Sequence, residues 1–175
     1  MHTKEFNKLK KNGYVVLENV LSEKKCKNYI TILEKLHKKY SPLYVGNNKT
    51  KHKLNNQSDE KIVYNLQNKD FQFIKLINTN PIYKIVDDYL NLGSYNKKEI
   101  INLRQFTGRS PLPGKGDQQL HIDSRIPGGS FPLMVVVTWM LNDFNKYNGA
   151  TKLIPKSHKN KSFKIDKKKY KNEKI

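Results

Sequence analysis

The sequence places an imidazole and a carboxylate two positions apart in Gln119-Leu120-His121-Ile122-Asp123. The apolar and polar residues alternate there, which predicts a β-strand. Because successive side chains of a strand point to opposite faces, we expect His121 and Asp123 to project the same way and Ile122 to enter the opposite layer. An imidazole nitrogen and a carboxylate oxygen arranged in this way can occupy adjacent corners of one metal ion.

The ligand types favour a particular metal chemistry. A second histidine from a facing strand would complete a 2-His-1-carboxylate triad, which leaves three positions open on Fe(II) for a 2-oxo acid and O2. A closed structural zinc site would prefer a fourth protein ligand and usually sulfur, whereas this chain has the single Cys26. An H-x-D triplet is by itself weak, since a core histidine beside a surface aspartate gives the same pattern.

The pattern around the triplet predicts an α+β fold in which helices come first and strands later. The whole chain, 1–175, is expected to be a single domain, with a helical part over about 1–98 and a β-rich metal-site part over about 99–175. Apolar residues at three- and four-residue spacing predict the helices, and β-branched runs predict the strands. Helices are expected at 3–11, 22–40, 70–78 and 80–90, and strands at 14–17, 62–66, 100–106, 119–123, 133–142 and 150–154.

The composition suggests no nucleic-acid partner, although Lys and Arg (34) exceed Asp and Glu (15) to give a net charge of +19. Proteins that clamp phosphates favour the bidentate guanidinium of arginine, and this chain has only Arg104, Arg109 and Arg125. The lysines are spread along the chain, which favours a coding bias over a binding patch. The longest apolar run, 133–141, is too short to cross a membrane, and the polar first residues lack a signal peptide. We therefore expect a cytoplasmic protein with no membrane partner.

Several segments together resemble the phytanoyl-CoA dioxygenase family of Fe(II)- and 2-oxoglutarate-dependent oxygenases. The resemblance begins with Asn12-Gly13-Tyr14-Val15-Val16-Leu17, continues through 119–123 and Trp139, and ends with a turn and strand at 148–159, Asn-Gly-Ala-Thr-Lys-Leu-Ile-Pro-Lys-Ser-His-Lys. The order and spacing agree over nearly the whole chain. The resemblance implies a double-stranded β-helix core, which is jelly-roll or cupin-like, with the N-terminal helices packed on one of its sheets.

The resemblance also implies roles for individual residues. His121 and Asp123 would be the catalytic metal ligands and hold Fe(II), while Trp139, Leu103 and Lys61 would line the site of 2-oxoglutarate, the co-substrate. Trp139 has an alternative as an ordinary core aromatic, and the alignment at Lys61 can slip by one residue. Arg104 is a further basic candidate; on a core strand its guanidinium should have an acidic partner.

The sequence departs from the family in two places. Lys156 replaces the usual glycine before Ser157-His158. In the family, the distal iron histidine and the arginine that grips 2-oxoglutarate follow this segment, yet neither residue type occurs after His158 here. A ligand role for His158 is disfavoured, because a turn histidine is better explained by hydrogen bonding to the backbone. We therefore expect an incomplete jelly roll, whose exposed strand edges would need a second chain to supply the missing strands.

Three hypotheses follow. The first is a dioxygenase that hydroxylates a small organic or acyl substrate with O2 and releases succinate and CO2, either as a fragment or completed by a second chain. The second is a truncated, non-catalytic homologue with the same fold. The third is a basic polyanion-binding protein, which would leave the spacing of His121, Asp123 and Trp139 unexplained. The identity of the substrate lies in variable loops such as 44–60 and 109–117.

Overall fold

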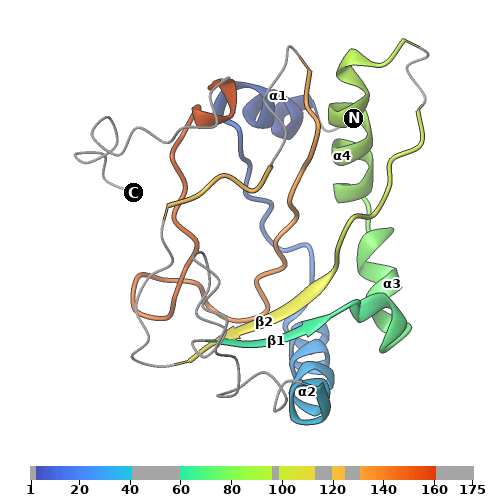
Figure 1. Cartoon of the computed structure of the whole chain (residues 1–175), viewed down its shortest axis with the longest axis vertical. Coiled ribbons are helices and arrows are strands. Elements are labelled where there is room, and N and C mark those ends of the chain that lie inside the picture. Colours follow the sequence, from blue (N-terminus) through green and yellow to red (C-terminus); the bar gives the residue numbers. More distant parts are fainter. Residues whose placement is uncertain (1–2, 41–59, 96–98, 113–119, 125–130, 161–175) are drawn as a thin grey trace.

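The computed structural model describes residues 3–40, 60–95, 99–112, 120–124 and 131–160. The described part is α+β, with four α-helices and a two-stranded antiparallel sheet (Figure 1). The predicted fold class is therefore confirmed at this level. The α-helices are α1 (Thr3–Asn12), α2 (Glu23–Tyr40), α3 (Gln72–Ile77) and α4 (Ile82–Leu90); the strands are β1 (Glu60–Tyr64) and β2 (Thr107–Pro111); short 3-10 turns are η2 (Leu66–Asn68), η3 (Asn91–Gly93) and η4 (Ser157–Lys159).

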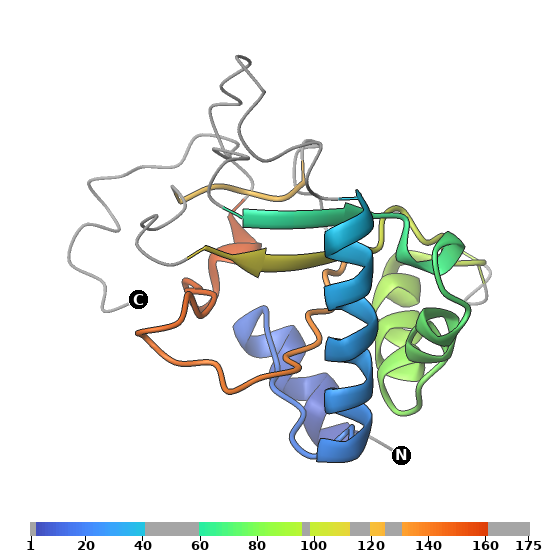
Figure 2. The ribbon, with the colours of Figure 1, turned by 90° about the horizontal axis from the view of Figure 1, so that it is seen from below.

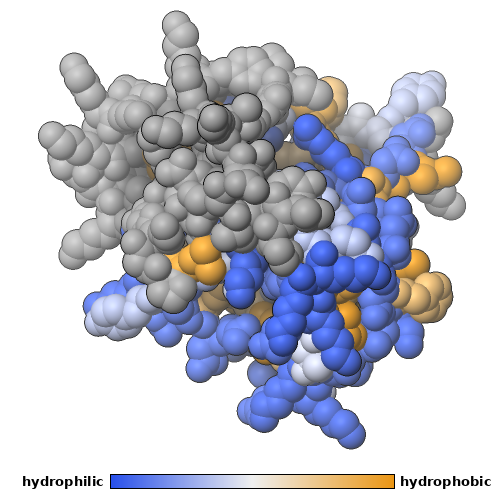
Figure 3. Space-filling model, turned by 60° about the horizontal axis from the view of Figure 1, so that its bottom comes forward, coloured by the Kyte–Doolittle hydropathy of each residue, from blue (hydrophilic) through white to orange (hydrophobic). Residues whose placement is uncertain are grey.

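Helix α2 covers one face of the sheet and is the longest helix of the described chain (Figure 2). The hydroxyl of Ser22 accepts a hydrogen bond from the backbone N–H of Lys25 at 3.4 Å, as expected of an N-cap residue. The predicted apolar stripe faces the core through Tyr29, Leu33 and Leu36. The opposite face carries exposed lysines, and from this side most of the described surface is hydrophilic (Figure 3).

The sheet pairs two segments that lie far apart in the sequence. Ile62 lies opposite Arg109, and Val63 lies opposite Gly108. Gly108 is buried, and a side chain at this position would collide with Leu33 of α2. A glycine in the middle of β2 therefore lets the helix approach the strand closely.

The core lies where α2, β1 and α3 meet. Phe73 of α3 is 1% exposed, and its ring stands edge-on to Phe106 with 5.9 Å between ring centroids. The ring of Tyr29 lies 5.5 Å from Phe73 on another side. Burial of these rings supplies much of the hydrophobic stabilisation. The buried cluster consists of Tyr29, Val63, Leu66, Phe73 and Leu76, with Trp139 and Leu141 among the half-buried residues packed against it.

The predicted helices are confirmed with shifts of one or two residues at most of their ends, but most of the predicted strands are wrong. Segments 14–17, 100–106, 133–142 and 150–154 contain no strand, and 120–124, the described part of 119–123, contains none either. The composition of these segments favours strands, but a strand needs a partner to complete its backbone hydrogen bonds. The strand predicted at 62–66 is present as β1 at 60–64, and β2 occupies a segment that was expected to be a loop.

The double-stranded β-helix remains a prediction, because the described residues contain only the β1–β2 pair. The N-terminal part does carry most of the helices, and α2 packs on the sheet. Among the described residues, no helix has the length and apolar character needed to span a membrane.

Candidate metal centre

The side chains of His121 and Asp123 come together although their segment is not a strand. Nε2 of His121 lies 3.4 Å from Oδ1 of Asp123. The two side chains are 32% and 60% exposed, so both tips are accessible from solvent. The two groups therefore approach each other at a bend in the chain, and not on the strand that was expected to place them.

The distance between the two donor atoms suits one shared metal ion. With metal–ligand bonds of about 2.1 Å, ligands at adjacent corners of an octahedron lie roughly 3.0 Å apart. The observed 3.4 Å needs only a small rotation of either side chain to reach this value. One nitrogen and one carboxylate oxygen are also the donor set that borderline metals such as Fe(II) accept. The two residues thus fit two corners of the expected triad.

No third protein ligand joins this pair within the described ranges, where no group of three His, Cys, Asp or Glu side chains could hold a metal. The other two described histidines are engaged elsewhere. His37 is buried in α2, and its Nε2 donates to the carbonyl oxygen of Gly108 at 3.4 Å. His2 and His52 lie outside the described residues.

His158 has a structural role that the sequence indicated only in part. Its Nε2 donates a hydrogen bond to the carbonyl oxygen of Lys10 at 3.1 Å, at the C-terminal end of α1. The backbone N–H of Lys156 donates to the carbonyl oxygen of Asn12 at 2.7 Å. These bonds satisfy carbonyl groups that a helix leaves unpaired at its end. The expected hydrogen bond to backbone is present, but its acceptor belongs to the other end of the chain.

Lys156 occupies the left-handed region of the backbone with φ 65°. A glycine adopts this conformation without the steric cost that a side chain brings. The glycine expected at this position by resemblance therefore has a clear physical purpose, and the turn forms here with a lysine instead.

The three residues expected to line the co-substrate site lie in different surroundings. Lys61 is exposed on β1, and its charge acts on His37 of α2. Leu103 is 50% exposed in the segment before β2, whereas Trp139 is half-buried against the core cluster. None of the three forms a hydrogen bond or ion pair with His121 or Asp123 in the described structure. Their role as co-substrate contacts stays a prediction, and Trp139 also fits its alternative as a core aromatic.

Arg104 differs from its expected environment. It is exposed rather than set in a core strand, and its Nη1 contacts Sδ of Met134 at 3.5 Å. The expected acidic partner is absent among the described residues, because the exposed guanidinium remains hydrated and does not require one.

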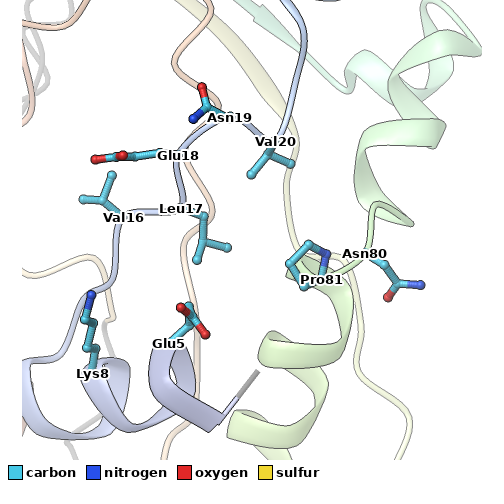
Figure 4. Close-up of a pocket in the computed structure, with 9 residues that line it drawn as sticks. All are labelled: Glu5, Lys8, Val16, Leu17, Glu18, Asn19, Val20, Asn80 and Pro81. Atoms are coloured by element: carbon cyan, nitrogen blue, oxygen red, sulfur yellow. The ribbon is translucent and has the colours of Figure 1, made fainter. Parts of the chain in front are cut away.

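A groove of about 530 Å3 lies between α1, the segment after it and the start of α4 (Figure 4). It does not include His121 or Asp123. Its polar side chains do not converge on one point; the amide of Asn80 and the carboxylate of Glu18 point in different directions (Figure 4). The groove is therefore not a second candidate active site.

Comparison with models of protein families gives a match over most of the chain. A family model described as phytanoyl-CoA dioxygenase matches residues 9–174. The matched region contains His121, Asp123 and all three residues expected at the co-substrate site. No curated protein and no solved structure matches the chain.

Proposed function

Because the chain belongs to the phytanoyl-CoA dioxygenase family, we propose that His121 and Asp123 hold Fe(II) in a 2-oxoglutarate-dependent dioxygenase. Enzymes of this family generally depend on Fe(II) and 2-oxoglutarate and use O2 on small molecules. The bound iron would couple oxidation of 2-oxoglutarate to succinate and CO2 with hydroxylation of an aliphatic carbon. The substrate class that fits is a small organic or acyl compound. The associated core would be a double-stranded β-helix.

The proposal rests on one observation, the 3.4 Å approach of His121 Nε2 to Asp123 Oδ1. Both groups are accessible, so a metal can reach them without a rearrangement of the core. The carboxylate of Asp123 attracts a divalent cation locally, against the overall repulsion from a chain whose net charge is +19. His121 can supply a neutral imidazole nitrogen as a ligand, as metal binding requires.

The second candidate is a non-catalytic homologue with the same fold. It is favoured by the exposure of both ligands and by the lack of a third ligand in the described ranges. A two-ligand site holds a metal more weakly than a complete triad. The two candidates therefore differ in metal affinity and in the ability to bind 2-oxoglutarate on the metal.

The test is an anaerobic titration with Fe(II) and 2-oxoglutarate, followed by the visible charge-transfer band of the chelated complex. The proposal predicts a band in the wild type that disappears in His121→Ala and Asp123→Ala. Asp88→Asn is a matched control, because Asp88 is an exposed aspartate of α4 that pairs with Lys84; this variant should keep the band. Weak metal binding without a band would favour the non-catalytic homologue. A band of unchanged intensity in both ligand variants would refute the assignment.

A further inference from the structure

We draw no further inference here: the strongest candidate, the surface patch of exposed apolar side chains beside η3 (Leu92, Tyr95, Ile100 and Phe131), carries none, because nothing in the described structure shows what covers it.

Discussion

The imidazole of His158 lies directly against Gly13, so a methyl group at Gly13 would collide with Nδ1 of the ring. Gly13 directly follows α1 and has φ +84°. His158 lies in η4, at the other end of the described residues. Two motifs that mark the family thus meet in space and join α1 to η4. Their contact is structural, which separates His158 from the metal ligands.

Replacement of Gly13 by alanine should therefore destabilise the protein through two effects. A side chain at positive φ costs about 1 kcal/mol or more, and the collision with His158 adds to it, so we expect a loss of about 2 kcal/mol in unfolding free energy. In a His158→Ala background the collision is absent, and the loss should fall to about 1 kcal/mol. Urea unfolding of the four proteins measures this difference. Equal losses in both backgrounds would contradict the contact.

Replacement of Lys156 by glycine should stabilise the protein. Removal of the side chain from the left-handed conformation at φ 65° should raise the unfolding free energy by about 1 to 2 kcal/mol. The greater conformational entropy of glycine in the unfolded chain should lower it by about 0.5 to 1 kcal/mol. We expect a net gain of about 0.5 to 1 kcal/mol in unfolding free energy. Lys159→Gly, at a position without positive φ, is the control and should lower stability. The prediction is wrong if both glycine variants lose stability equally.

The stability of the fold should depend on pH through His37. Burial lowers the pKa of this histidine, while the hydrogen bond to the Gly108 carbonyl and the charges of Lys61 and Glu34 act in smaller measure. The unfolded chain binds a proton at about pH 6.5 and the folded chain only at lower pH. Between these values the unfolded state holds more protons, so the unfolding free energy rises with pH.

Stability should thus be fully present above about pH 6.5 and decline as the pH falls through this value toward the lower pKa of the folded state. His37→Gln retains an N–H donor for Gly108 but does not titrate, so its stability should decline less between pH 7.5 and pH 5. Urea midpoints at three pH values compare the two proteins. Parallel declines would show that other groups carry the pH dependence.

Local features of the fold could be predicted from the sequence, and long-range pairing could not. The helix-capping role of Ser22 and the apolar stripe of α2 follow from residues within one helix. The pairing of β1 with β2 places Gly108 under Leu33 of α2, where a side chain would not fit. From the sequence alone, Gly108 is indistinguishable from a loop glycine. The segment 131–142 has the composition of a strand, but composition cannot tell whether a partner strand is present.

The candidate site also combines features that the sequence predicts with features that depend on the tertiary structure. The two-residue spacing of His121 and Asp123 placed their side chains close enough to approach each other, but the approach occurs at a bend and not on the predicted strand. The surroundings of Lys61, Leu103 and Trp139 depend on where their segments lie in the tertiary structure. The engagement of His158 with Lys10 could be found only by bringing the two ends of the described chain together.

The most direct test of the metal centre uses the five histidines of the chain as internal reporters. Substoichiometric Mn(II), a paramagnetic ion that accepts nitrogen and carboxylate ligands, is added while the histidine side-chain NMR signals are recorded. Our account predicts that the His121 signals broaden first, well before those of His37 and His158, and that Asp123→Asn removes this selectivity. Uniform broadening of all histidines, or selective broadening that survives Asp123→Asn, would contradict a metal shared by His121 and Asp123.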